Sequence, residues 1–164
     1  MKKMLVWLSM VLIGTNVIAQ NAPKSPRVEA KGENVTIAYG QPSKNNRDIF
    51  GALVPYGEIW RTGANKSTDI TFDKDATFGG KKVKAGTYAL FTIPGEKEWT
   101  IILNSQPAQS GAFDYDKTKD KNVLEVKAPV QSRSDVQEKF TISAPKGAVV
   151  FEWDKTKVSV PLKF

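Results

Sequence analysis

The segment from Gly57 to Asn65 holds the side chains best suited to chemistry in this chain. Arg61 presents a planar set of donors that matches carboxylates and vicinal oxygens, and Asn65 offers both a donor and an acceptor. Tyr56 and Trp60 supply flat apolar faces next to them. This combination predicts a binding site for a polar, ring-shaped ligand such as a sugar.

The same residues also fit a purely structural role. In that alternative Trp60 anchors the core, Arg61 satisfies buried carbonyl oxygens and Gly63 permits a turn. Burial separates the two interpretations. An enclosed Arg61 bonded to backbone carbonyls favours structure, whereas an open concave site lined by Tyr56 and Trp60 favours binding.

Catalysis has few candidate residues here. The sequence contains no His and no Cys, which excludes Ser-His-Asp and Cys-His catalysis, thiol redox chemistry and ordinary zinc sites. Asp48, Glu58 and Asp69 flank the aromatic segment, and glycoside hydrolysis needs only two carboxylates. Their spacing does not pair them. We therefore expect a noncatalytic protein, with a two-carboxylate glycoside hydrolase as the less favoured alternative.

Residues 114–125 resemble a calcium-binding loop, because oxygen-bearing side chains recur at the ligand positions of such loops. The glycine that makes the sharp turn is replaced by Lys119, and Lys117 and Lys121 add positive charge against a cation. We predict a polar connecting loop, with no metal and no cofactor.

Residues 1–19 have the organisation of a signal peptide. Lys2 and Lys3 precede an almost unbroken apolar run over residues 4–13, and residues 17–19 fit a cleavage site before Gln20. The run is shorter than the roughly 20 residues of a membrane span, and no second run follows. We expect a periplasmic or secreted protein with no transmembrane segment after cleavage and no nucleic-acid partner. Cleavage lowers the net charge from +7 to +5, which favours anionic neighbours in the envelope.

The remaining chain divides into a flexible leader, residues 20–27, and a single domain, residues 28–164. Short β-type runs separated by Gly, Pro, Asn and Asp predict an all-β fold, an antiparallel β-sandwich, with the jelly roll as one candidate arrangement. We predict strands at residues 28–30, 35–39, 68–72, 76–78, 87–93, 99–104, 123–128, 138–144, 148–153 and 156–162. The predicted core between two sheets comprises Tyr88, Leu90, Phe91, Trp99, Ile101, Phe140, Ile142 and Phe151.

Three further expectations concern the elements around the candidate site. The apolar runs at residues 87–93 and 99–104 predict a central hairpin that is covered on both faces. Residues 47–65 carry neither a strand period nor helix caps, which predicts an ordered loop or a single helical turn packed against the domain. The lysines of residues 81–84 lie beside glycines and predict a solvated turn.

Three strings of this sequence closely resemble the family called domain of unknown function 2911. They are residues 47–65 (RDIFGALVPYGEIWRTGAN), 85–94 (AGTYALFTIP) and 98–104 (EWTIILN). The resemblance implies an exported bacterial β-domain without an assigned activity. It points to Arg47, Phe50, Gly51, Pro55, Tyr56, Trp60, Arg61, Gly63, Ala64 and Asn65. Relatives often have an acid after the Asn, where this chain has Lys66, so the resemblance supports no catalytic role at that position.

Together these observations predict a noncatalytic domain that binds an envelope glycan or another polar ligand. The candidate ligand-binding residues are Arg47, Tyr56, Trp60, Arg61 and Asn65. The alternative is a structural or protein-interaction domain with no small-molecule site. The ligand and the oligomeric state stay open.

Overall fold

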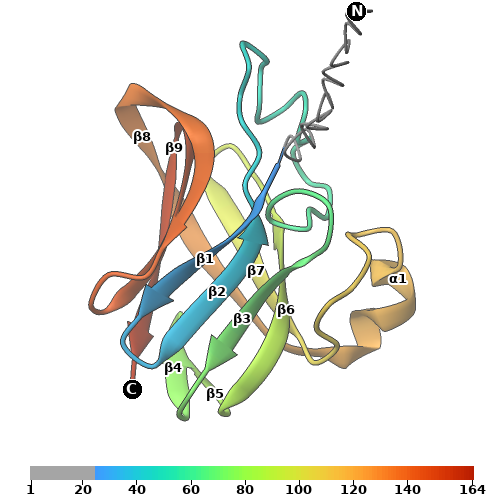
Figure 1. Cartoon of the computed structure of the whole chain (residues 1–164), viewed down its shortest axis with the longest axis vertical. Coiled ribbons are helices and arrows are strands. Elements are labelled where there is room, and N and C mark those ends of the chain that lie inside the picture. The colour runs from blue at the N-terminus through green and yellow to red at the C-terminus, as the bar shows by residue number, and fades with distance from the viewer. Residues whose placement is uncertain (1–24) are drawn as a thin grey trace, which may run out of the picture.

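Antiparallel strands make up most of residues 25–164, which are the residues that the computed structural model describes (Figure 1). The elements are β1 (Arg27–Gly32), β2 (Val35–Gly40), β3 (Thr68–Phe72), β4 (Ala76–Phe78), β5 (Lys81–Val83), β6 (Gly86–Ile93), β7 (Glu98–Asn104), α1 (Tyr115–Thr118), η1 (Lys119–Lys121), β8 (Asn122–Ser143) and β9 (Ala148–Lys163). The predicted signal peptide lies outside the described residues. Within residues 25–164, no helix has the length and apolar character that crossing a membrane requires.

The strands form one nine-stranded sheet in the order β1-β2-β3-β6-β7-β8-β9-β4-β5. Every pair of neighbouring strands is antiparallel, which confirms the predicted all-β class. The order is that of a meander, from which only the β4–β5 hairpin departs to pair with β9. It is not the order of a jelly roll, because most consecutive strands pair directly with each other.

The two layers predicted as separate sheets are parts of one sheet, because β8 takes part in both. Residues 122–129 of β8 pair with β7, and residues 130–143 pair with β9. The sequence predicted two strands within β8, residues 123–128 and 138–144, and two within β9, residues 148–153 and 156–162. Between Ser132 and Thr141 the pairing of β8 with β9 is interrupted by two register shifts, and backbone groups of Glu138 and Phe140 bond to the segment after β2.

The sheet curls so that the β8–β9 hairpin approaches β2 (Figure 1). The backbone N–H of Phe140 donates to the carbonyl oxygen of Pro42 at 2.9 Å, and that of Ile142 donates to the hydroxyl of Tyr39 at 3.1 Å. One large apolar core fills the inside of this curl. Predicted core residues that are buried there are Leu90, Trp99, Ile101, Phe140, Ile142 and Phe151.

The other two predicted core residues lie elsewhere. Tyr88 is only partly buried and packs at the margin of the core. Phe91 points to the opposite face of the sheet, because successive side chains of a strand alternate and Leu90 faces inward. There it forms a second cluster with Ala89 and Ile102. Residues that cover this cluster are Ile59, Ile93, Ala112 and Tyr115. The β6–β7 hairpin is therefore covered on both faces, as predicted.

Two segments contain more regular structure than the sequence indicated. Residues 81–83 form the edge strand β5 instead of a turn, because Val83 is buried and anchors the strand beside β4. Residues 114–125 contain a short helix and a 3₁₀ turn before β8 begins. Within them Lys117 pairs with Asp114 at 2.7 Å and Lys121 pairs with Asp120 at 2.9 Å. Lys119 also pairs with Asp116 at 3.6 Å, so three of the acids that suggested a calcium loop are paired with lysines.

Candidate functional site

The loop between β2 and β3, residues 41–67, carries all five candidate ligand-binding residues. It contains no helix and only single bridges, as predicted for residues 47–65. Trp60 and Thr92 of β6 exchange two backbone hydrogen bonds of 2.7 and 3.0 Å, and the N–H of Gly57 donates to Pro94 at 2.8 Å. These bonds fix the loop on the end of the central hairpin.

Trp60 is part of the core. It is 9% exposed and lies among four aromatic rings of the loop, the sheet and the β8–β9 hairpin. It stacks on Trp153 with ring centroids 6.0 Å apart and planes 14° apart, and its Nε1 donates to the carbonyl oxygen of Gly63 at 3.2 Å. Only a small part of the indole remains for a ligand.

A tight turn after Trp60 brings Arg61 and Asn65 to the surface. Thr62 is fully buried at a left-handed φ of 56°, and its carbonyl oxygen accepts a 2.6 Å hydrogen bond from the Thr68 hydroxyl. Gly63 lies against the backbone of β2, where a Cβ would approach the carbonyl oxygen of Gly40 to 2.8 Å. The turn therefore needs glycine at this position.

A pocket of about 330 Å³ opens beside this turn. Its lining residues are Ser25, Pro42, Arg47, Leu53, Val54, Trp60, Arg61, Gly63, Ala64, Asn65 and Trp153. Four of the five candidate residues, Arg47, Trp60, Arg61 and Asn65, thus line one pocket. Tyr56 does not. It is 41% exposed, and its ring packs against Gly51.

Backbone oxygens hold both arginines of the pocket in place. Nε of Arg47 donates to the carbonyl oxygen of Lys44 at 2.9 Å, and Nη2 of Arg47 donates to the carbonyl oxygen of Ser43 at 2.6 Å. Arg61 donates from Nη1 to the carbonyl oxygen of Asn65 at 3.1 Å. Between residues 25 and 164, neither guanidinium forms an ion pair with a carboxylate. The pocket therefore carries uncompensated positive charge.

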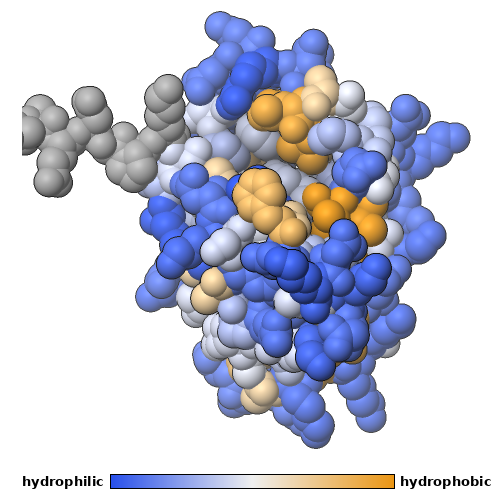
Figure 2. Space-filling view, turned by 90° about the vertical axis from the view of Figure 1, so that its right-hand side faces the viewer, coloured by the Kyte–Doolittle hydropathy of each residue, from blue (hydrophilic) through white to orange (hydrophobic). Residues whose placement is uncertain are grey.

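Asn65 and Phe113 complete the surroundings of Arg61. Asn65 has a left-handed φ of 65°, and its Nδ2 donates to the carbonyl oxygen of Ser25 at 3.1 Å. The Phe113 ring, 82% exposed, lies with its centroid 5.3 Å from Cζ of Arg61. Figure 2 faces the side of the molecule that carries α1, where small apolar areas are surrounded by hydrophilic residues.

Leu53 and Trp153 line the pocket without having been predicted as site residues. Leu53 belongs to the apolar loop segment that was expected to pack on the domain, and its exposed position at a pocket has no signal in the sequence. Trp153 lies in the strand predicted at residues 148–153 but was not among the predicted core residues, although it is buried. Its place beside the loop depends on how the sheet curls.

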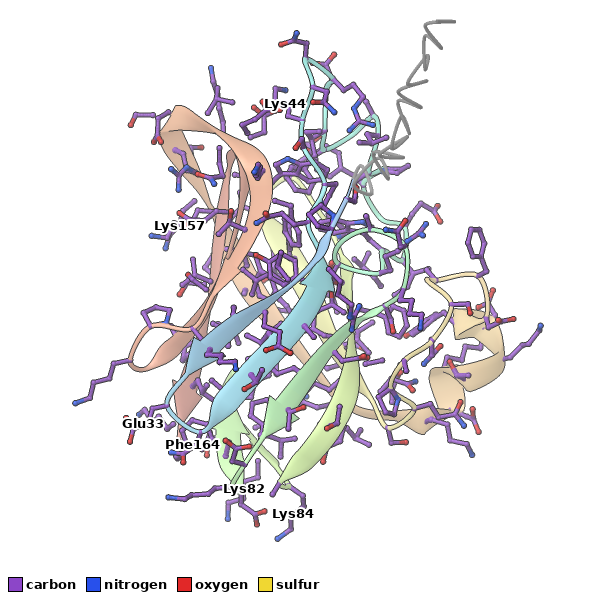
Figure 3. All side chains as sticks on the ribbon, in the orientation of Figure 1. Glu33, Lys44, Lys82, Lys84, Lys157 and Phe164 are labelled. Atoms are coloured by element: carbon purple, nitrogen blue, oxygen red, sulfur yellow. The ribbon has the colours of Figure 1, made fainter. Side chains whose placement is uncertain are left out.

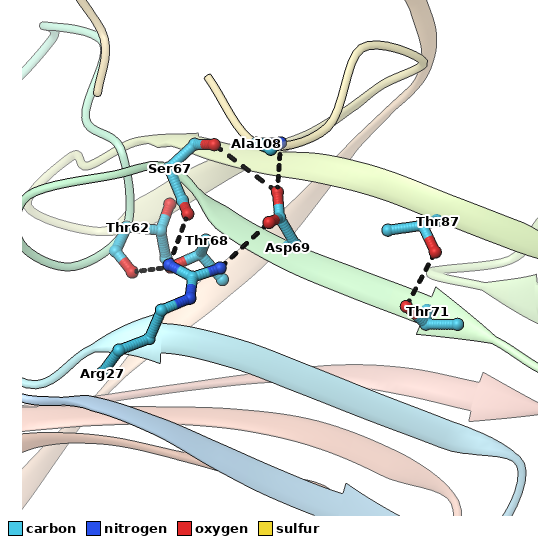
Figure 4. A network of polar contacts seen from close by, with 8 residues as sticks. All are labelled: Arg27, Thr62, Ser67, Thr68, Asp69, Thr71, Thr87 and Ala108. Atoms are coloured by element: carbon cyan, nitrogen blue, oxygen red, sulfur yellow. Dashed lines mark hydrogen bonds and ion pairs between the residues drawn. The ribbon is translucent and has the colours of Figure 1, made fainter. Parts of the chain in front are cut away.

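The three carboxylates considered for glycoside hydrolysis, Asp48, Glu58 and Asp69, do not line this pocket. Asp69 belongs to a separate network (Figure 4). Its Oδ2 accepts a 2.9 Å hydrogen bond from Arg27, and its Oδ1 accepts one of 2.9 Å from the backbone N–H of Ala108. Glu58 is an exposed residue of the loop. The described part of the chain therefore brings no acid and base together at the pocket.

The fold and the site define an all-β domain whose curled antiparallel sheet carries a small basic pocket in the loop between β2 and β3. The chain belongs to the family described as protein of unknown function (DUF2911), whose family model matches residues 22–162. This match confirms the resemblance seen in the sequence. Searches of the curated proteins and of the solved structures gave no match.

Proposed function

We propose that this protein is an exported, noncatalytic binding domain of the cell envelope whose pocket takes a glycan or a similar polar ligand. One observation carries the proposal. The chain gathers Arg47, Arg61 and Asn65 around a single open pocket, although they are spread over a loop with no regular structure.

The composition of the pocket suits a sugar ring. Its volume of about 330 Å³ lies near the lower end of the range of ligand pockets, roughly 300–1,000 Å³. Guanidinium donors and an amide can bond ring hydroxyls, while the exposed Leu53 and the small accessible parts of Trp60 and Trp153 offer apolar surface to ring carbons. A monosaccharide unit is the size of ligand that matches this volume.

The absence of a carboxylate from the lining supports binding over hydrolysis. Two-carboxylate mechanisms place an acid and a second carboxylate roughly 5–10 Å apart across the scissile bond. No Asp or Glu is among the described residues that line the pocket. A ligand held there meets donors and apolar surface.

One specific observation favours a structural or protein-interaction domain instead. Trp60 is almost fully enclosed by other aromatic rings, and Arg61 already spans the turn to the carbonyl oxygen of Asn65. On this alternative the segment only fastens the loop to the sheet. Arg61 would then matter for stability, and the pocket would take no ligand.

Thermal unfolding of residues 20–164 against a panel of envelope glycans and small sugars separates the two. A ligand at about 100 times its Kd adds roughly 2.7 kcal/mol to the free energy of unfolding. The proposal predicts such an increase for the parent and its loss in a folded Arg61→Ala variant. Lys82→Ala is the matched control, since it removes one positive charge at the opposite end of the molecule from Lys44 and its loop (Figure 3).

Two results would contradict the proposal. One is a panel that stabilises neither the parent nor the control, together with an Arg61→Ala variant that melts far below the parent. The other is stabilisation that Arg61→Ala retains and Lys82→Ala loses, because the ligand would then bind at the other end.

A further inference from the structure

The charge of the pocket narrows the class of ligand, on the premise that the proposed function is right. We propose that the ligand is an acidic glycan, in which a sugar ring carries an anionic group that binds between Arg47 and Arg61. The argument rests on three features: the unpaired guanidinium groups, their fixed orientation, and the apolar surface next to them.

The first feature is charge without compensation. Both Arg47 and Arg61 line the pocket, and no acidic side chain does so among the described residues. The neighbouring cation differs in this respect, because Lys44 pairs with Asp154 at 3.0 Å. The fold thus neutralises Lys44 with an acid and leaves Arg47 and Arg61 to the pocket.

The second feature is the orientation of the guanidinium groups. Arg47 is bonded to two backbone oxygens and Arg61 to one, so both planes are held by neutral acceptors that leave their charge intact. Among residues 25–164, Nη1 of Arg47 and Nη2 of Arg61 have no hydrogen-bond partner. Donors fixed before binding lose little side-chain freedom when a ligand arrives.

The third feature separates a sugar from a simple anion. Leu53, which is 44% exposed, offers apolar surface at the pocket, where Trp60 and Trp153 are almost wholly buried, and a bare anion such as inorganic phosphate gains nothing from it. Charge-assisted hydrogen bonds from arginine are roughly twice as strong as neutral ones. A ligand with an anionic group and a ring uses both parts of the pocket.

The main comparison of the test is between a free acid and its methyl ester, which differ in charge. Two further ligands carry phosphate. Isothermal titration of residues 20–164 uses a galacturonic acid trimer, its methyl ester and galactose 6-phosphate, with inorganic phosphate as the anion alone. We expect the free acid to bind at least about ten-fold more tightly than the ester, because only the acid accepts charge-assisted hydrogen bonds from the arginines. This ratio should shrink between 50 and 500 mM salt, since the site is partly exposed to solvent.

Variants then assign the effect to the arginines. Arg47→Gln and Arg61→Gln should each lower the affinity for the acid about ten-fold and change that for the ester little, whereas Lys82→Gln should change neither. Arg47 is exposed, so its variant is expected to fold even if Arg61→Gln does not. Urea unfolding of each variant identifies any that has lost its fold.

The outcomes separate this inference from the proposed function. Equal binding of acid and ester overturns the acidic ligand and leaves a glycan site standing. Phosphate that binds as tightly as the acid shows that charge alone is recognised, and this overturns the sugar. Tighter binding of galactose 6-phosphate than of the galacturonic acid trimer assigns the anionic group to phosphate and supports the inference. Binding of none of the four overturns the inference, and the glycan panel above then decides the proposed function independently.

Discussion

The fit between Gly40 and Ala64 fixes the candidate site at the level of single atoms. Gly40 ends β2, and a Cβ at this position would lie 2.1 Å from the carbonyl oxygen of Ala64. Real Cβ atoms do not approach backbone oxygens so closely. The turn that carries Arg61 and Asn65 can lie against β2 only because residue 40 has no side chain.

Gly40→Ala should therefore destabilise the protein and disturb the pocket together. We expect the free energy of unfolding to fall by about 3 kcal/mol or more, because a backbone atom must move to make room. Gly80→Ala is the control. Its φ of 83° costs about 1–2 kcal/mol, but an added Cβ meets no atom within 4 Å. Urea unfolding measures both, and a Gly40→Ala protein as stable as the control would contradict this packing.

Four of the five candidate residues chosen by residue type line one pocket. Arg47, Arg61 and Asn65 lie within one loop, so their convergence on one pocket follows from the turn between them. Tyr56 was included for its flat ring, but it does not line the pocket, and its ring packs against Gly51 instead. Trp153 comes from β9, and no local pattern relates that strand to the loop.

At the scale of elements, β5 is a three-residue strand at the edge of the sheet. An edge strand exposes unpaired backbone groups that can pair with another chain, and lysines are a common means of preventing this. Lys81 and Lys82 are both exposed there. This accounts for the lysine cluster without a ligand.

Replacing both lysines with valine should promote self-association. The Lys81→Val, Lys82→Val double variant keeps a β-forming sequence and removes the charges that keep other chains away. Light scattering after incubation at equal concentration measures the effect. The Lys119→Val, Lys121→Val double variant removes the same charge from the exposed η1 turn and should scatter like the parent. Equal scattering from the two double variants would refute the role of the edge.

The connection between β5 and β6 is fastened to Asp75 beside β4. Lys84 Nζ donates to Oδ2 of Asp75 at 2.7 Å, and the N–H of Ala85 donates to Oδ1 at 2.9 Å. These two hydrogen bonds lower the pKa of the Asp75 carboxyl below its ordinary value, and the bond from Lys84 has the larger effect. The same pair raises the pKa of Lys84.

Lys84→Met should therefore move the pKa of Asp75 up toward its ordinary value. A carboxyl with a lowered pKa in the folded state stabilises the fold above its unfolded pKa of about 3.9. That contribution is lost as the pH falls through the lower folded value. Side-chain carbon NMR during acid titration reports the pKa of Asp75 directly. An unchanged pKa in the variant would show that Lys84 does not hold this carboxyl.

Strand boundaries were predicted best where apolar residues form a long, nearly continuous run. The runs of β6 and β7 were found almost residue by residue, because both of their faces are buried. The middle of β8 is polar and largely exposed. It carries no apolar signal in the sequence, so its continuity could not be predicted. β5 and α1 are too short for a periodic pattern.

At the scale of the whole molecule, the all-β class followed from composition and turn spacing, but the single sheet did not. Two layers around one core look alike in sequence whether or not a strand joins them, because inward residues alternate in both cases. The lengths of β8 and β9 decide the matter. They carry the sheet from one layer into the other and bring Trp153 to the loop of the site.

The proposed export concerns the whole chain and can be tested simply. The proposal predicts that the protein from its native host begins at Gln20 and is found outside the cytoplasm. Intact-mass measurement of protein purified from fractionated cells checks both points. A cytoplasmic protein that retains residues 1–19 would overturn the assignment and with it the expectation of an envelope ligand.

The central claim is that the pocket beside Arg61 binds a polar ligand, and a titration followed by NMR tests it most directly. The arginine Nε–Hε signals of ¹⁵N-labelled residues 20–164 are recorded as a galacturonic acid trimer is added. The account predicts saturable shifts at Arg47 and Arg61 and at the indole N–H of Trp153, with β4 and β5 unchanged. Shifts confined to the β4–β5 end, or none with the trimer and with every glycan of the panel, would contradict it.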